Sequence, residues 1–130
     1  ARRRRDGLAQ AGDDGTDELS ITGNTHVSQL MDGKIRYSSI RPQDAGLATS
    51  EGRALVGGDA NQNARALRDV LDGLPSPYAD AVILNAAAML MIAGKAPTLH
   101  EGAALARSTI GRGEARKKLD ELIEASFEDE

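Results

Sequence analysis

The feature of the sequence that most limits the fold is an apolar run in the second half of the chain. Pro77 stands at a first-turn position of a predicted helix over 76–93, and the residues AVILNAAAMLMIA at 81–93 are apolar on nearly every side of it. Such a helix needs other elements around it, so we expect it to be buried on every side. The run is 13 residues long, too short for a bilayer span, which takes about 20 residues.

A single amide interrupts this run. Asn85 lies near its centre, with apolar neighbours on both sides. A buried amide without a hydrogen-bond partner costs free energy. The sequence therefore predicts that Asn85 ties a neighbouring loop or backbone to the helix, which is a structural role and not a catalytic one.

Three further helices are predicted around the apolar one. Residues 59–73 repeat apolar side chains at helical spacing, with Asp59 as the N-cap. Thr98 and Glu101 have the spacing of a capping box at the start of the next helix. Residues 114–128 place apolar side chains on one face of a final helix.

The first third of the chain is predicted to contain one β-hairpin. Within 25–40, Asp32 and Gly33 form a two-residue turn signal of type I′, because glycine adopts positive φ freely. Residues 1–24 show no sustained period of 2 or 3.6 and are predicted to be tail and loop. The expected order is thus a loop, a hairpin and about four helices, which indicates the back half of a larger unit.

Composition and charge exclude several classes of function. The chain has no cysteine, so it forms no disulfide or thiolate metal site. Four of the 16 basic residues occupy positions 2–5, which leaves 12 basic against 20 acidic residues, a net charge of −8, in the rest. An acidic body with three scattered aromatic residues does not favour nucleic acid. We interpret the arginine run as a solvated terminal charge run, with a nucleic-acid or localisation role as the alternative.

The loop before the hairpin, DDGTDELSITGNT at 13–25, holds four carboxylates, two glycines and three threonines. Asp17 and Glu18 are adjacent in it, and such a pair repels itself unless a cation or solvent intervenes. Solvated acids and a cation site both fit the residues alone. His26 and His100 are far apart, and neither has the spacing of a zinc site.

Three stretches, taken in order, resemble the C-terminal part of the large domain of the anthranilate phosphoribosyltransferases. They are DGTDELSITGNTHVSQLMDGKI, then PQDAGL followed by GGDANQNARALRDVLDG, then YADAVILNAAAMLMIAGKAPTLHEGAALARSTIGRGEARKKLDEL. The resemblance covers residues 13–123. It implies part of an α/β domain of the kind shared by phosphoribosyltransferases and pyrimidine nucleoside phosphorylases.

The resemblance also implies a reaction and a metal. In the family, the amino nitrogen of anthranilate displaces pyrophosphate from C1 of phosphoribosyl pyrophosphate, a step of tryptophan synthesis in the cytoplasm. The family's adjacent acids hold Mg²⁺ against the pyrophosphate, and they fall on Asp17 and Glu18. Two carboxylates with substrate phosphates suit this hard cation. No catalytic or substrate-binding residue is carried over, and no nucleic-acid or membrane partner is expected.

Other features of the family pattern fall outside this match. The glycine-rich pyrophosphate loop, a second phosphoribosyl segment and the anthranilate arginine lie upstream in the family. VGGD at 56–59 resembles that loop superficially, but it follows no predicted strand and is interpreted as a helix-start turn. The family's strand ending in His-Gly has no counterpart in ARRRRDGLAQAGDDG. We therefore expect residues 1–12 to be a disordered basic leader and 13–130 to be the family segment.

Three functional interpretations follow from the sequence. The first is a C-terminal segment of an anthranilate phosphoribosyltransferase, inactive by itself, whose family pairs as a homodimer through an N-terminal domain. The second is a non-catalytic remnant that acts as a structural or interaction module. The third is a related phosphorylase, against which DELSITGNT argues.

Overall fold

The computed structural model describes residues 7–127. A three-stranded antiparallel sheet comes first and four α-helices follow. In chain order the elements are β1 (Gly7–Gly12), β2 (Thr25–Met31), β3 (Lys34–Ile40), the short 3-10 helices η1 (Pro42–Ala45) and η2 (Gly52–Leu55), α1 (Ala60–Leu71), α2 (Pro77–Ile92), α3 (Leu99–Gly111) and α4 (Glu114–Phe127).

The predicted hairpin is confirmed. Strands β2 and β3 pair from Thr25 opposite Ile40 to Met31 opposite Lys34. Asp32 and Gly33 both have positive φ, 51° and 77°, as a type I′ turn requires. The two-residue turn therefore sets the register of both strands.

The prediction that residues 1–24 contain no strand is wrong for Gly7–Gly12. This segment, β1, pairs antiparallel with β2, with Gly7 opposite Leu30 and Gly12 opposite Thr25. Its sequence GLAQAG has no β-branched or aromatic residue, so local propensity gives no strand signal. Pairing with β2 supplies the strand conformation instead. Residues 7–12 of the disordered leader predicted over 1–12 are therefore an ordered strand, whereas the arginine run at 2–5 lies outside the described residues.

The helices begin where their capping residues predict. Side chains of Asp59, Ser76 and Thr98 accept hydrogen bonds from backbone N–H groups in the first turns of α1, α2 and α3. Each such bond satisfies one of the N–H groups that a helix start leaves unpaired. The loop at 41–59 contains the two short 3-10 helices η1 and η2.

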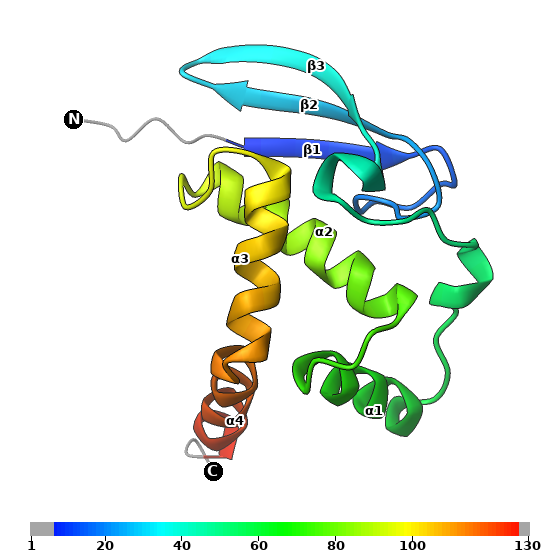
Figure 1. The fold of residues 1–130 in the computed structure, drawn as a ribbon, viewed down its shortest axis with the longest axis vertical. Coiled ribbons are helices and arrows are strands. Elements are labelled where there is room, and N and C mark those ends of the chain that lie inside the picture. The colour runs from blue at the N-terminus through cyan, green and yellow to red at the C-terminus, as the bar shows by residue number, and fades with distance from the viewer. Residues whose placement is uncertain (1–6, 128–130) are drawn as a thin grey trace.

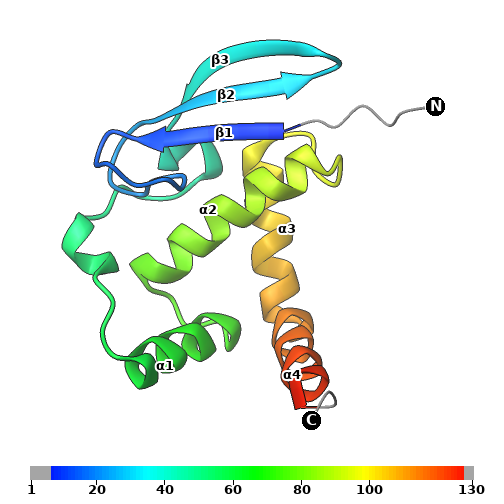
Figure 2. The same cartoon turned by 180° about the vertical axis from the view of Figure 1, so that it is seen from behind.

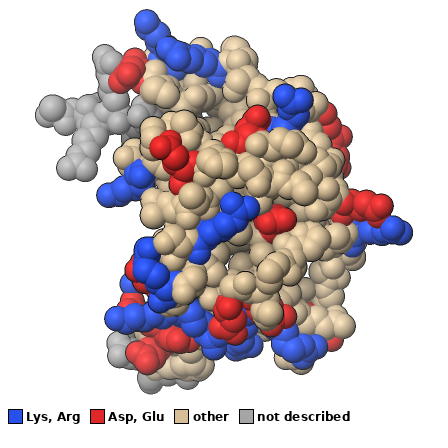
Figure 3. Space-filling model, viewed as in Figure 1, with Lys and Arg blue, Asp and Glu red and all other residues tan. Residues whose placement is uncertain are grey.

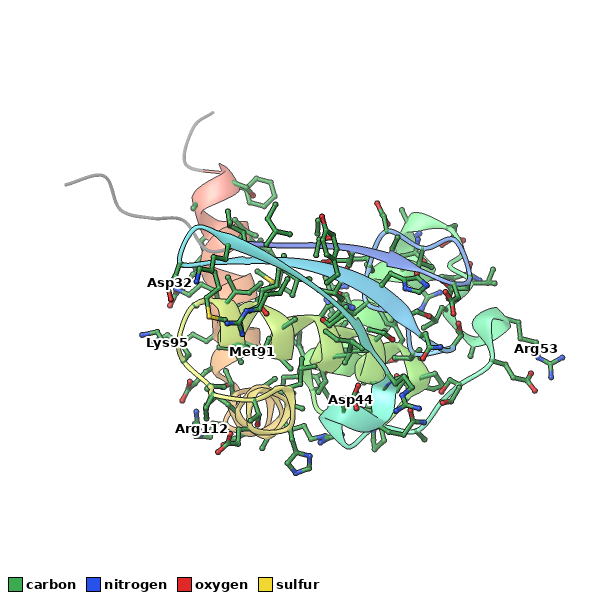
Figure 4. The ribbon with its side chains drawn as sticks, turned by 90° about the horizontal axis from the view of Figure 1, so that it is seen from above. Asp32, Asp44, Arg53, Met91, Lys95 and Arg112 are labelled. Carbon is green, nitrogen blue, oxygen red and sulfur yellow. The ribbon has the colours of Figure 1, made fainter. Side chains whose placement is uncertain are left out.

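The sheet lies across one side of α2, and α3 crosses the same helix near its end (Figure 1). The view from behind shows α1 beside the other half of α2 and α4 continuing beyond α3 (Figure 2). Seen from above, Met91 and Lys95 lie at the same end of the molecule as Asp32 in the hairpin turn, whereas Arg53 projects outward at the opposite end (Figure 4). Helix α2 is therefore the element that joins sheet and helices.

The expectation that the apolar helix is buried on every side is wrong for α2. Ile83, Leu84 and Ala87 are buried against the sheet and α3. Met89, in contrast, is 71% exposed and Tyr78 is 40% exposed. The sheet and α3 cover two sides of α2, and η1, η2 and α1 contact it over short stretches. The part of its surface that carries Met89 stays exposed.

Helices α2 and α3 approach closely because small residues face each other. A Cβ atom built on Gly102 would lie 2.7 Å from the carbonyl oxygen of Ala87 and 3.0 Å from its Cα. Ala87 and Ala103 are fully buried in the same contact region. With three aromatic residues in the whole chain, close backbone contact takes the place of bulky side chains in this core.

Among residues 7–127, no helix combines the length and the apolar character needed to cross a membrane.

We expect Gly102→Ala to destabilise the protein by about 1–3 kcal/mol, because the added methyl group forces α2 and α3 apart. Gly111→Ala is the matched control in the same helix, since no atom lies within 4 Å of its built Cβ. Alanine there is expected to be neutral or to stabilise by up to about 1 kcal/mol. Urea unfolding followed by circular dichroism measures both changes. Equal effects of the two substitutions would contradict this account of the helix contact.

Candidate functional site

The loop between β1 and β2, residues 13–24, carries all four carboxylates of the acidic stretch. Backbone hydrogen bonds close it at its base: Gly12 N donates to Thr16 O at 2.9 Å, and Asp13 N donates to Asn24 O at 3.0 Å. The loop is thus a defined structure attached to two paired strands. Its four acids fall into two pairs with different surroundings.

Asp14 is fully engaged by donors from its own loop. Its Oδ1 accepts from Thr16 N at 3.1 Å and Thr16 Oγ1 at 2.8 Å. Its Oδ2 accepts from Ser20 Oγ at 2.5 Å and Thr22 Oγ1 at 2.6 Å. The Ser20 hydroxyl, then those of Thr22 and Thr16, hold the pKa of Asp14 well below its ordinary value of 3.8, while desolvation opposes them.

Asp13 is the second acid with a partner. Its Oδ1 lies 2.9 Å from Nε2 of His26 on β2, and both side chains are largely exposed. This exposed contact contributes little to stability. It nevertheless directs Asp13 toward the sheet and away from the middle of the loop.

Asp17 and Glu18 form the other pair. Both are exposed. Within residues 7–127, neither carboxylate has a hydrogen-bond or ion-pair partner, unlike those of Asp13 and Asp14. The chain therefore leaves two adjacent carboxylates available while it uses the two that precede them. The predicted metal residues are therefore consecutive in the sequence, exposed and free.

The donor set of this pair fits a hard divalent cation. Carboxylate oxygens are the ligands that Mg²⁺ prefers, and the ion is often bound by one or two carboxylates while water and phosphate fill its other positions. Among residues 7–127, no group of three or more His, Cys, Asp or Glu side chains converges on one point. Asp17 and Glu18 could thus supply two ligands, with the others from solvent and a phosphate group.

Asn85 of α2 fixes the residue that follows the pair. Its Oδ1 accepts from Leu19 N and its Nδ2 donates to Leu19 O, both at 3.0 Å. The same Nδ2 donates to Ala81 O at 3.0 Å. The prediction that this amide ties a loop to the helix is confirmed. It joins the acidic loop to the element at the centre of the fold.

An apolar groove of about 450 Å³ lies beside the free pair. Asp17 and Glu18 form part of its wall. The remaining wall is mostly the uncovered surface of α2 together with the end of η2, and its apolar side chains are those of Leu55, Tyr78, Ala81, Val82, Ala86 and Met89. The free carboxylates therefore stand at the edge of a surface from which water is easily displaced.

The GGD segment does not resemble a phosphate cradle in this structure. Gly58 is held by Asn63, whose Oδ1 accepts from Gly58 N at 2.9 Å and whose Nδ2 donates to Gly58 O at 3.1 Å. Asp59 accepts from Gln62 N at 2.8 Å and so caps α1. The interpretation of 56–59 as a helix-start turn is confirmed.

Charges elsewhere on the surface are intermixed. On the face shown in Figure 3, acidic and basic side chains alternate over the lower part, where α4 lies in Figure 1. In α4, for example, Nη1 of Arg116 lies 2.7 Å from Oδ1 of Asp72, and Nε of Arg116 lies 3.5 Å from Oδ1 of Asp120. These exposed pairs contribute little to stability.

Sequence reasoning missed the role of Asp14. Of the four acids in the loop, only Asp17 and Glu18 were predicted to have a function, and Asp13 and Asp14 were not distinguished from each other. The available signal was the set of hydroxyl residues at 16, 20 and 22, since Ser and Thr commonly bond a nearby Asp in a loop. Spacing alone does not show which of the four acids these hydroxyls contact.

We expect Asn85→Leu to destabilise the protein, because it leaves the N–H and C=O of Leu19 without partners. Leu19 is 2% exposed, and each buried group left unpaired costs about 1–3 kcal/mol. Asn63→Leu is the matched control: that amide also bonds both backbone groups of one residue, but at an exposed position. Its expected cost is below about 1 kcal/mol. Urea unfolding compares the two, and equal costs would contradict the importance of the Leu19 contact.

The lowered pKa of Asp14 predicts a pH dependence of stability. Above its ordinary value of 3.8, the carboxylate is charged in the folded and unfolded chain, and its bonds contribute fully. Below that value the unfolded chain takes up a proton that the folded chain resists, so the contribution falls with pH. The stability difference between the wild type and Asp14→Asn should be constant above about pH 5 and narrow below about pH 4. Urea unfolding at fixed ionic strength tests this, and a difference that stays unchanged down to about pH 2.5 would contradict it.

Comparisons with known proteins identify the family. A profile described as "Glycosyl transferase family, a/b domain" matches residues 3–116. Anthranilate phosphoribosyltransferases of Rhodopseudomonas palustris (strain HaA2) and Bradyrhizobium sp. (strain ORS 278) are 50% and 49% identical over 115 residues. That match covers 88% of this chain and 34% of each relative, so the chain spans about a third of the length of these relatives.

Solved structures agree with the sequence match. The anthranilate phosphoribosyltransferase of Thermus thermophilus aligns with a TM-score of 0.80 at 38% identity, over 89% of this chain and 34% of that one. The Saccharomyces cerevisiae enzyme in complex with PRPP and Mg aligns with a TM-score of 0.80 at 26% identity, over 87% of this chain and 33% of that one. The predicted resemblance and the partial α/β fold are confirmed. The chain belongs to the glycosyl transferase family described by that a/b domain.

Proposed function

We propose that this chain carries the magnesium-binding acids of an anthranilate phosphoribosyltransferase, with Asp17 and Glu18 as the ligands. The observation that carries the proposal is the division of the four loop acids: Asp13 and Asp14 have partners, whereas the adjacent pair is free. The names of the relatives and the yeast complex with PRPP and Mg support the substrate and the ion.

The residues of this chain would act on the phosphate side of the reaction. The amino nitrogen of anthranilate forms a bond to C1 of the ribosyl group, the bond from C1 to pyrophosphate breaks with its electron pair, and the nitrogen loses a proton. Asp17 and Glu18 would hold Mg²⁺, which would supply positive charge beside the departing pyrophosphate. The Asn85–Leu19 contact keeps their loop against α2.

The remaining contacts belong to the part of the family's chain that is not matched here. We propose that the 130 residues by themselves have negligible turnover, and that residues 13–130 form the C-terminal segment of the family's large domain. The uncovered surface of α2 supports this, because an apolar face needs a covering element. We also propose that the protein acts in the cytoplasm and that the full-length family member forms a homodimer through its N-terminal domain.

A chimera tests the proposal. The segment of the Rhodopseudomonas palustris (strain HaA2) relative that matches this chain over 115 residues is replaced by the chain, and magnesium-dependent formation of phosphoribosyl-anthranilate is followed by fluorescence. We expect turnover in the chimera and none in the isolated chain. The double substitution Asp17→Asn/Glu18→Gln should reduce the rate at least about 100-fold, or about 2.7 kcal/mol in activation free energy.

The control is Asp13→Asn/Glu51→Gln. It removes the same charge from exposed acids whose partners are His26 and Arg53, and it is expected to leave the rate within about threefold of the unsubstituted chimera. Full magnesium-dependent turnover without Asp17 and Glu18 would refute the assignment. Clear turnover by the isolated chain would refute the expected inactivity.

A further inference from the structure

Asp14 connects the two sides of the free acidic pair. Thr16 directly precedes Asp17, and Ser20 lies two positions after Glu18. One oxygen of Asp14 bonds the N–H and hydroxyl of Thr16, and the other bonds the hydroxyl of Ser20. A single side chain thus closes the segment that presents both free carboxylates.

The same network reaches the buried sheet. Ser20 is 4% exposed, and its N–H donates to Oγ1 of Thr25 at 2.9 Å. Thr25 is the first residue of β2 and is fully buried. Ser20 Oγ also accepts from Thr22 N at 3.0 Å. The contacts of Asp14 are therefore anchored to a rigid element and do not depend on exposed loop atoms alone.

The end of β1 is shaped around Asp14. A Cβ atom built on Gly12 would lie 2.5 Å from Oδ1 of Asp14 and 2.6 Å from Oγ1 of Thr16. Any other residue at this position would push the carboxylate or the hydroxyl aside. Gly12 has ordinary φ, so close approach and not backbone conformation explains the glycine.

Asp14 is not itself free to bind a cation. Each of its two oxygens already accepts two hydrogen bonds, from Thr16, Ser20 and Thr22. A cation would have to displace these donors. The carboxylate therefore acts on the loop and not on a ligand.

We propose that Asp14 is a positioning residue, which fixes the backbone of residues 16–20 so that the carboxylates of Asp17 and Glu18 stay adjacent and available to one divalent cation. The role toward the cation rests on the proposed function, whereas the fixing of the loop does not. Residues that orient metal ligands through hydrogen bonds typically change metal affinity about 10–100-fold when they are replaced.

The first measurement needs no metal. Backbone ¹⁵N relaxation and amide hydrogen exchange of the whole chain compare Asp14→Ala with Asp13→Ala, which removes the same charge one position away. We expect Asp14→Ala to lower the order parameters and exchange protection of residues 15–22, while Asp13→Ala leaves them near the wild-type values. Unchanged α2 and α3 amides show that each variant folds, and Asp14→Asn serves as a milder variant. An equally ordered loop in Asp14→Ala or Asp14→Asn would overturn the proposal.

The second measurement uses Mn²⁺ as the probe. Paramagnetic broadening of the Asp17 and Glu18 amides gives an affinity for the wild type, for Asp14→Ala and for Ser20→Ala/Thr22→Val. The double variant removes both hydroxyl donors to Oδ2 of Asp14 but keeps every charge. Both variants should bind about 10–100-fold more weakly, and Asp13→Ala within about threefold of the wild type. Wild-type affinity in the hydroxyl variant would overturn positioning as the cause.

The two measurements separate this proposal from the proposed function. Absence of broadening at Asp17 and Glu18 in the wild type would count against these residues as metal ligands. The order of the loop in Asp14→Ala would then still decide whether Asp14 fixes residues 16–20.

Discussion

The paired hydrogen bonds between the Asn85 side chain and the Leu19 backbone are the interaction on which the site depends. The amide presents a donor and an acceptor together, as a neighbouring strand would, but from the middle of a helix. Leu19 and Leu84 are buried beside this contact, so the hydrogen bonds and the apolar packing support each other. The acidic loop is thereby attached to the core, into which it also buries Leu19 and Ile21.

The use of four acids in one loop illustrates how a chain keeps some charges available. Two carboxylates with partners, Asp13 and Asp14, shape the loop, and two without partners, Asp17 and Glu18, face solvent. Adjacent free carboxylates repel each other, which destabilises the loop unless other bonds hold it. The hydroxyls around Asp14 supply those bonds. Asp13 and Asp14 thus hold the loop in shape, while the carboxylates of Asp17 and Glu18 remain available to a ligand.

Much of the fold could be predicted because its signals are local. The Asp32-Gly33 turn and the capping residues Asp59 and Thr98 act on atoms a few positions away. The role of Asn85 was also predictable, since a buried amide must find a partner. Strand β1 was not, because GLAQAG acquires its conformation from β2. The exposure of Met89 was missed as well, because periodicity describes the faces of a helix and not the number of elements available to cover them.

The position of β1 in the sheet has a consequence for how such a chain is made in a cell. The strand order β1-β2-β3 leaves the outer side of β1 without a strand among residues 7–127. Its sequence GLAQAG has no lysine and no proline, the residues that commonly prevent unwanted pairing at such an edge. While this side of β1 stays open during synthesis, its backbone groups are accessible to any extended segment nearby. An open strand edge of this kind favours association between partly folded chains.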